Sequence, residues 1–105
     1  MTDIATLNDD FRKTLTGGRV MLTHGINVMP ADDIANILSK VRRFNDFTPD
    51  NDPYSERDFG AFDYKDEKIF WKIDYYDKTL RYLSNDPANP EQTVRIMTIM
   101  KASEY

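Results

Sequence analysis

The sequence is poor in the residues that build most metal and covalent chemistry, because its 105 residues include no cysteine and one histidine, His24. The absence of cysteine excludes disulfides, thiolate zinc sites and thiol catalysis, and it is typical of a reducing compartment. A single imidazole excludes a metal site built on two histidines, whereas one general base is still compatible with the sequence. We therefore expect neither a metal nor a cofactor.

Long hydrophobic runs are also missing. No apolar stretch approaches the roughly 18 residues that a membrane-spanning helix needs. The start, Met1-Thr2-Asp3-Ile4, lacks the basic segment followed by an apolar one that marks a secretory signal. These absences predict a cytoplasmic protein with no membrane partner.

Positive charge is in the minority, with 14 Lys and Arg against 18 Asp and Glu and a formal net charge of -4. Because the phosphate backbone of nucleic acid attracts basic proteins, this acidic balance predicts that the protein does not bind nucleic acid directly. The charges are unevenly distributed, since acidic residues crowd between Asp46 and Asp77. A local basic patch is still compatible with the first half of the chain, which contains Arg12, Lys13, Arg19, Lys40, Arg42 and Arg43.

Hydrophobic residues make up 40% of the sequence and charged residues 30%, a composition that predicts one folded domain over residues 1–105. Apolar residues at three- and four-residue steps predict a first helix over residues 3–15. Thr2 or Asp3 is expected to cap its start, and Gly17-Gly18 to end it. A short strand follows over residues 19–24, and residues 25–27 are expected to break it.

A second helix is predicted from Met29-Pro30 to Phe44, because proline suits the first helical position and Asp32 and Asp33 complement the helix dipole. The stretch from Asn45 to Arg57 contains two prolines and several acids, and it predicts an irregular loop.

An aromatic-rich hairpin is predicted over residues 58–64 and 69–76, with a polar turn from Lys65 to Lys68. A third strand over residues 79–83 would extend it. Alternation places one set of side chains toward the helices, namely Ile69, Trp71, Ile73 and Tyr75. The last segment, residues 92–100, favours a strand, with a short helix through Met97 as the alternative. The predicted fold is α+β, with two helices packed on one face of a largely antiparallel four- to five-stranded sheet.

The loop sequence Asp50-Asn51-Asp52 offers oxygen ligands, but the EF-hand spacing is incomplete, and an Asx turn before Pro53 explains the same residues. No assembled catalytic set is evident, so we assign no catalytic residue. We predict a binding surface instead, formed by the acidic loop and by the strand face turned away from the helices. Its residues are Asp50, Asp52, Tyr54, Asp58, Lys72, Asp74, Tyr76 and Arg81.

Five motifs occur together in this chain: Thr16-Gly17-Gly18-Arg19-Val20, Asp50-Asn51-Asp52-Pro53, Asp58-Phe59-Gly60-Ala61-Phe62, Trp71-Lys72-Ile73-Asp74-Tyr75-Tyr76-Asp77 and Met97-Thr98-Ile99-Met100. In this combination the sequence, from about Leu7 to Tyr105, resembles the family called domain of unknown function 3768. The resemblance implies a small bacterial protein, often carried on mobile genetic elements. It implies no activity and no catalytic residue.

The leading functional hypothesis is a non-enzymatic macromolecule-binding protein of bacterial or mobile-element origin. In its specific form it is an acidic, anti-CRISPR-like inhibitor of a host nucleic-acid-handling or defence complex, and its partner is a protein or a protein–nucleic-acid complex. One alternative is a small enzyme such as a ribonuclease-type toxin, tested at His24, Asp52, Asp58, Lys72 and Tyr76. The other is a self-associating structural or regulatory protein, in the simplest case a homodimer.

Overall fold

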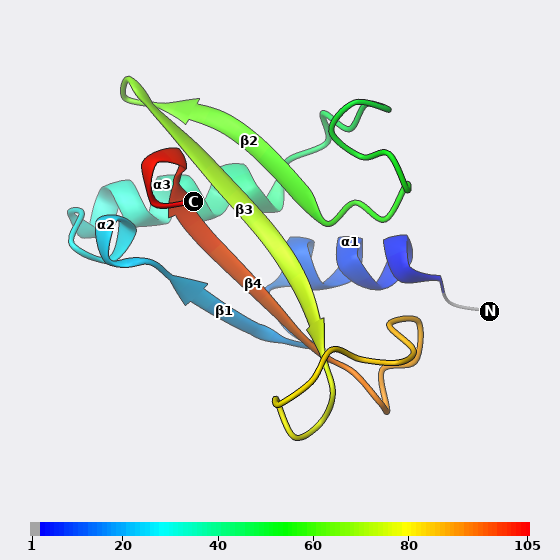
Figure 1. Ribbon diagram of the computed structural model, residues 1–105. Coiled ribbons are helices and arrows are strands. Elements are labelled where there is room, and N and C mark those ends of the chain that lie inside the picture. Colours follow the sequence, from blue (N-terminus) through cyan, green and yellow to red (C-terminus); the bar gives the residue numbers. More distant parts are fainter. Residues whose placement is uncertain (1–2) are drawn as a thin grey trace.

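The computed structural model describes residues 3–105, which fold into three α-helices, a four-stranded mixed sheet and a terminal 3₁₀ helix (Figure 1). The chain is therefore an α+β protein. Its elements are α1 (Ile4–Thr14), β1 (Arg19–Leu22), α2 (His24–Asn27), α3 (Ala31–Arg42), β2 (Phe59–Tyr64), β3 (Glu67–Tyr76), β4 (Val94–Lys101) and η1 (Ala102–Glu104). No helix within residues 3–105 has the length and apolar character needed to cross a membrane.

The strand order is β1-β4-β3-β2, so the last strand of the sequence lies in the interior of the sheet. The pairs β2–β3 and β3–β4 are antiparallel, whereas β1 and β4 are parallel. The sheet is thus mixed: two of its three strand pairs are antiparallel, in line with the expected largely antiparallel sheet, and the parallel pair β1–β4 was not expected. Periodicity predicted these four strands, but it carries no information on which neighbour each strand takes.

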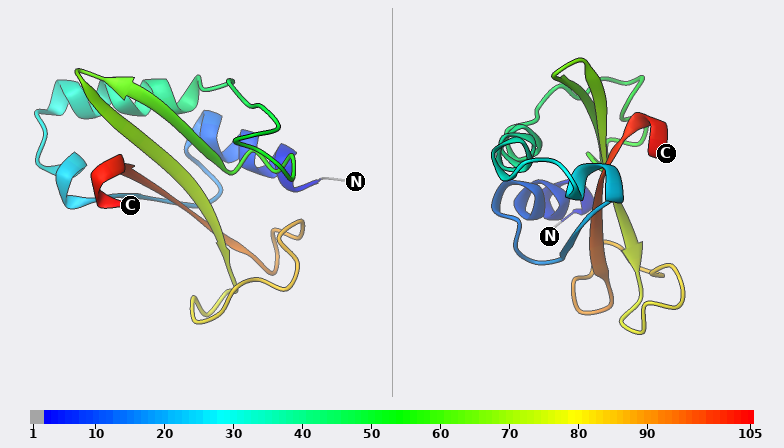
Figure 2. Two further views of the ribbon diagram at one scale, coloured as in Figure 1. Left: turned by 45° about the horizontal axis from the view of Figure 1, so that its top comes forward. Right: turned by 90° about the vertical axis from the view of Figure 1, so that its left-hand side faces the viewer.

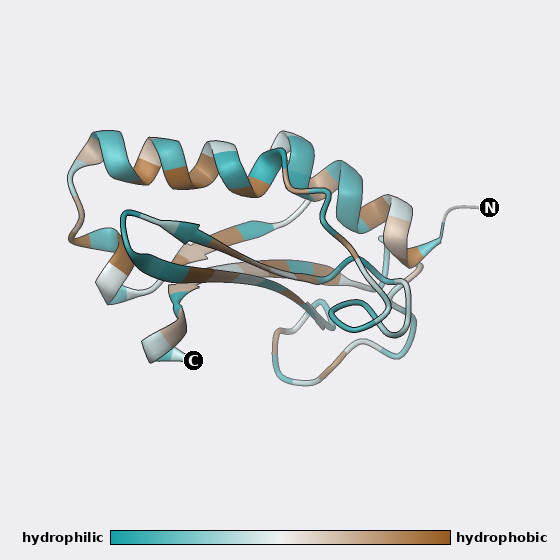
Figure 3. Ribbon diagram, turned by 90° about the horizontal axis from the view of Figure 1, so that it is seen from above, coloured by the Kyte–Doolittle hydropathy of each residue, from teal (hydrophilic) through white to brown (hydrophobic). Residues whose placement is uncertain are grey.

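Helices α1 and α3 lie on the same side of the sheet (Figure 3), and the right-hand view of Figure 2 shows both beside its edge-on strands. The core fills the space between these layers, with Trp71 at 0% exposure. Its members are Phe11, Ile26, Ile37, Val41, Ile69, Trp71, Ile73, Met97 and Ile99. The predicted inward orientation of Ile69, Trp71 and Ile73 is confirmed.

Helix α1 begins as predicted, because the Asp3 carboxylate accepts a hydrogen bond from the backbone N–H of Thr6 at 2.8 Å. The alternative cap, Thr2, lies outside the described residues. The end of helix α1 differs from the prediction, because the residue that caps it in the left-handed conformation is Leu15, with φ 57°, and not a glycine. Gly18 is needed for another reason: a Cβ there would lie 2.6 Å from the carbonyl oxygen of Arg95.

The predicted third meander strand, residues 79–83, does not form. Only one bridge, Tyr76 with Leu83, continues the ladder. The Asp77 carboxylate instead accepts from the backbone N–H and the hydroxyl of Thr79, so a local turn competes with strand pairing. The predicted fifth strand was therefore wrong.

Two smaller boundaries also differ. The expected break at residues 25–27 is the one-turn helix α2, whose Ile26 is fully buried. The hairpin turn consists of Lys65 and Asp66 alone, with φ values of 46° and 67°, so β3 starts at Glu67. Two consecutive positive φ values match the strand twist in tight hairpins. The final segment is a strand, as predicted.

Candidate functional site

One side of the sheet faces away from the helices, and we call it the outer sheet face. Its β3 residues alternate with the buried set, and Lys72 and Asp74 form an ion pair there with Nζ 3.1 Å from Oδ2. The strand register places the other members beside them. By this register the outer sheet face comprises Arg19, Met21, Phe59, Ala61, Asp63, Lys68, Phe70, Lys72, Asp74, Tyr76, Val94, Ile96, Thr98 and Met100.

Aromatic rings form one end of this face. The ring centroid of Phe70 lies 5.2 Å from that of Phe59 and 5.6 Å from that of Tyr105, both in edge-on contacts. Tyr105 follows η1, which is held in place by the Glu104 carboxylate. That carboxylate accepts from Thr23 Oγ1 at 2.7 Å and from the backbone N–H groups of Gly25 and Lys101. The chain end thus contributes to the outer sheet face.

The other end of the face is bordered by the connection from β3 to β4. Its first half lies on the same side of the sheet as η1 (Figure 2, right). Tyr82 and Leu83 in this connection are both 71% exposed, and the predicted site residue Arg81 is exposed beside them. Of the predicted residues, Lys72, Asp74 and Tyr76 are therefore grouped on one face, with Arg81 near its border.

The predicted site residues of the acidic loop, residues 45–57, differ in exposure. Asp50 and Tyr54 are exposed, whereas Asp52 is only 9% exposed and its Oδ1 accepts from the backbone N–H of Arg57 at 3.0 Å. Asn51 completes the local turn through its contact with the backbone N–H of Thr48. Asp52 thus shapes the loop, and Asp50 offers a carboxylate to solvent. Within residues 3–105 no three His, Asp or Glu side chains are grouped so as to hold a metal ion.

Asp58 connects this loop to β3, because its carbonyl oxygen accepts from the backbone N–H of Ile73 at 2.8 Å. Partial burial raises the pKa of its carboxyl above the usual value of 3.8, and the nearby charges of Glu56, Asp52 and Asp74 raise it further. The folded protein therefore binds this proton more tightly than the unfolded chain does.

This pKa direction predicts the pH dependence of an Asp58→Asn variant. Because the folded pKa is raised, ionisation of Asp58 lowers stability as the pH rises above 3.8 through the folded pKa. The variant cannot ionise, so its melting temperature at pH 7 should exceed that of the parent, and the difference should vanish below pH 3.8. Thermal unfolding followed by tryptophan emission measures both. Asp63→Asn, at an exposed carboxylate, is the control, and a lower melting temperature of Asp58→Asn at pH 7 would contradict the prediction.

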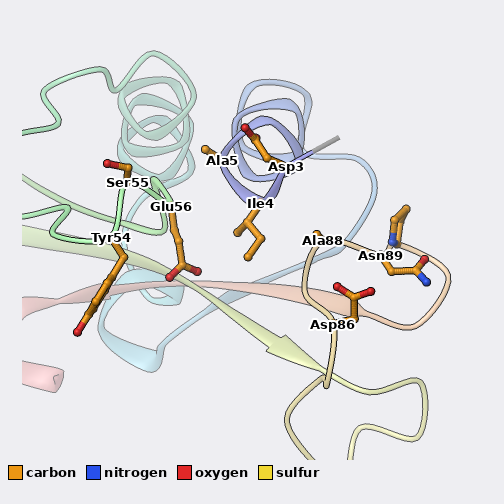
Figure 4. A pocket seen from close by; sticks show the side chains of 10 residues that line it. Asp3, Ile4, Ala5, Tyr54, Ser55, Glu56, Asp86, Ala88 and Asn89 are labelled. Carbon is orange, nitrogen blue, oxygen red and sulfur yellow. The ribbon is translucent and has the colours of Figure 1, made fainter. Parts of the chain in front are cut away.

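A pocket of about 850 Å³ opens between the start of α1, the acidic loop and the β3–β4 connection (Figure 4). Tyr54, Ser55 and Glu56 line one side of it, and Asp86 and Asn89 lie opposite. The remaining lining residues are Asp3, Ile4, Ala5, Ala88 and Pro90. The pocket walls thus carry carboxylates and apolar groups but no basic side chain. His24, the only imidazole, starts α2 at the other end of the sheet (Figure 1).

A buried polar network connects the elements around this pocket. Asn8 is fully buried, and its amide donates to Tyr75 Oη at 2.8 Å and to the carbonyl of Glu56 at 2.9 Å. Its Oδ1 accepts from Arg95 Nε at 2.8 Å, and Arg95 also donates to the carbonyl of Pro87. Burial lowers the pKa of the Arg95 guanidinium and raises that of the Tyr75 hydroxyl.

Sequence reasoning missed this network. Its only local signal is the spacing of Asn8 and Arg12. These two polar residues lie four positions apart on the buried side of α1, where apolar side chains are the rule. The Arg12 guanidinium is not part of this network. It forms an ion pair with Asp9 at 2.9 Å and donates hydrogen bonds to the carbonyl groups of Val41 and Phe44. Arg95 is 87 positions away from Asn8, so their contact had no signal in the sequence.

The residues weighed for an enzyme are spread over the molecule. Lys72 and Tyr76 belong to the outer sheet face, Asp52 and Asp58 to the acidic loop and its junction with β3, and His24 to α2. A nucleophile, a base and an orienting group would have to lie within hydrogen-bond reach of one another. These five side chains do not form such a set.

The family model described as "Protein of unknown function (DUF3768)" matches residues 22–104. The chain belongs to this family. The resemblance expected from the motifs is thus confirmed, although the DUF3768 match starts at Leu22, and the segment from Leu7 to Met21 lies outside it. The matched range contains every member of the outer sheet face except Arg19 and Met21. No curated protein and no solved structure matches the chain.

Proposed function

We propose that this DUF3768 protein is a non-enzymatic, cytoplasmic protein-binding module whose contact surface is the outer sheet face. The observation that carries the proposal is the composition of β4, which is apolar toward both sides of the sheet. Its inward residues include Met97 and Ile99. Its outward residues are Val94, Ile96 and Thr98, which are partly exposed, and Met100, which is covered and only 3% exposed. A sheet with one solvated side normally presents polar residues there.

The surroundings of this apolar strand support the same function. Met21 is 55% exposed on the neighbouring strand, and Tyr105 is 77% exposed at the aromatic end of the face. Contiguous apolar surface of this kind marks sites of protein association, and exposed tyrosines supply contact area at a small entropic cost. The Lys72–Asp74 pair adds charges of both signs near the centre, which favours a specific partner orientation.

The partner in this proposal is a host protein or protein–nucleic-acid complex, and the specific form of the function is inhibition of a complex that handles nucleic acid or defends the cell. The acidic balance of the chain supports this form, because acidic side chains resemble phosphates electrostatically. Asp50 is an exposed carboxylate of the loop and suits this role.

A pair of matched substitutions tests the surface. Met21→Glu introduces a charge on the outer sheet face and should weaken partner binding at least about tenfold, as for a disrupted hot spot. Val28→Glu is the control, since Val28 is also apolar and 63% exposed but lies beyond α2, outside the face. Tagged wild-type and variant proteins are used to capture partners from nuclease-treated bacterial lysate, and affinity for the purified partner is then measured.

Three outcomes decide the proposal. A partner retained by the wild type and by Val28→Glu but lost by Met21→Glu supports it. Equal binding by all three proteins assigns the partner to another surface and overturns it. A concentration-dependent dimer that only Met21→Glu dissociates, measured by light scattering, replaces it with the self-association alternative.

A further inference from the structure

Four exposed basic residues gather where α1 and α3 end, and we call them the basic strip. They are Lys13, Lys40, Arg42 and Arg43. Within residues 3–105 none of the four has a carboxylate oxygen within 4.0 Å, in contrast to Arg57, Lys65, Lys68, Lys72 and Lys101, which do. Neighbouring cations without counter-charges create a positive potential that attracts anions.

The strip is continuous because two hollows share Arg43. The first, of about 300 Å³, is lined by Lys13, Ser39, Arg42 and Arg43. The second, of about 220 Å³, is lined by Lys40, Arg43, Phe44 and Phe62. No acidic side chain lines either hollow.

Backbone contacts hold the arginines of the strip in place. Arg42 Nε donates to the carbonyl of Lys13 at 2.8 Å, which also connects α3 to α1. Arg43 Nε donates to the hydroxyl and the carbonyl of Ser39. Both contacts use only Nε, so the terminal guanidinium nitrogens remain free to bind an anion, and the side chains lose less entropy on binding.

Aromatic side chains distinguish this strip from a simple anion site. Phe44 and Phe62 are half-buried in the second hollow, and Lys40 Nζ lies 6.0 Å from the ring centroid of Phe62. Successive cations with adjacent aromatic rings match the phosphates and bases of a single strand, since bases stack on aromatic side chains while the backbone follows the positive charges.

We infer that the basic strip binds the backbone of a single-stranded nucleic acid, with Phe62 contacting a base. The net charge of -4, on which the sequence-level expectation rested, averages over the whole surface and conceals this patch. The strip belongs to the helix side of the molecule, whereas the outer sheet face lies on the other side (Figure 3). A nucleic acid and a protein partner can therefore be bound at the same time.

Binding of a fluorescein-labelled oligothymidylate, followed by anisotropy at low salt, tests the inference. Lys40→Ala/Arg43→Ala should weaken binding at least about tenfold and reduce the slope of log K against log salt by about 1.4, or about 0.7 for each lost phosphate contact. Lys78→Ala/Arg81→Ala is the matched control, because it removes two exposed cations of the β3–β4 connection that have no carboxylate oxygen of residues 3–105 within 4.0 Å. It should bind within about twofold of the wild type.

The aromatic part has its own variant. Phe62→Leu keeps an apolar side chain against the core but removes the stacking surface, and it should weaken oligonucleotide binding about fivefold without changing the salt slope. Tryptophan emission verifies that each variant is folded. The inference is overturned by absence of binding at low salt, by equal losses in both double variants, or by a strip that binds polyglutamate and not oligothymidylate. Met21→Glu should leave this binding unchanged, so failure here is separate from failure of the proposed protein-binding function.

Discussion

Replacing Gly60 with alanine is expected to lower the free energy of unfolding by about 3 kcal/mol, at the upper end of the usual cost of overpacking a core. A Cβ at this position would lie 2.4 Å from Trp71 Nε1, 2.7 Å from Trp71 Cε2 and 2.8 Å from Phe44 Cζ. The indole cannot move aside easily, because Phe44 and Phe47 pack against it edge-on with centroids 5.5 and 6.1 Å away. Arg12 covers its ring as well.

The single tryptophan makes this prediction easy to measure. Trp71 is fully buried, so its emission reports unfolding in a denaturant titration without any label. Gly17→Ala is the control: beyond Gly17 and its two chain neighbours, no heavy atom of the described residues lies within 4 Å of the added methyl, and only the φ of 90° opposes it, at a cost of about 1 kcal/mol. If both variants lose the same stability, the close approach of strand β2 to Trp71 is not the cause.

Asn8→Ala is expected to cost about 3 kcal/mol, because it removes one fully buried side chain that forms hydrogen bonds with three polar groups. Arg95 Nε would lose its acceptor, which leaves the guanidinium with the carbonyl of Pro87, and within residues 3–105 no carboxylate oxygen lies within 4.0 Å to replace the lost one. Tyr75 Oη and the carbonyl of Glu56 would lose a donor. A hydrogen bond lost by a buried charged group is more costly than an ordinary lost hydrogen bond.

Asn36→Ala is the matched control for this variant. Asn36 also lies on a helix and also donates to a tyrosine hydroxyl, that of Tyr64 at 3.2 Å, but it is exposed, so we expect a loss below about 0.5 kcal/mol. A double-mutant cycle with Arg95→Met then measures the coupling energy between Asn8 and Arg95. We expect the double variant to lose less stability than the two single variants lose in total. Additive losses would show that the two side chains do not depend on each other.

The features predicted correctly from the sequence are those that neighbouring residues decide. The start of α1 at Asp3 and the inward face of β3 follow from a cap geometry and from periods of 3.6 and 2 residues. The wrong prediction of a strand over residues 79–83 also has a local cause. A weak strand pattern competed there with the turn formed by Asp77, and the turn prevailed. The placement of Lys72, Asp74 and Tyr76 on one face also needed only alternation.

The sequence by itself determined most of the elements, the α+β class and the family, because backbone preferences and hydrophobic periodicity act over a few residues. Only the tertiary structure decided that β4 enters between β1 and β3, that Asn8 meets Arg95 and that Lys13 joins Arg42. These contacts are chosen by the burial of apolar surface and the pairing of polar groups over the whole chain. The apolar pattern of β4 permits burial on either side, and the packing of α1 and α3 on one side left Val94, Ile96 and Thr98 partly exposed on the other.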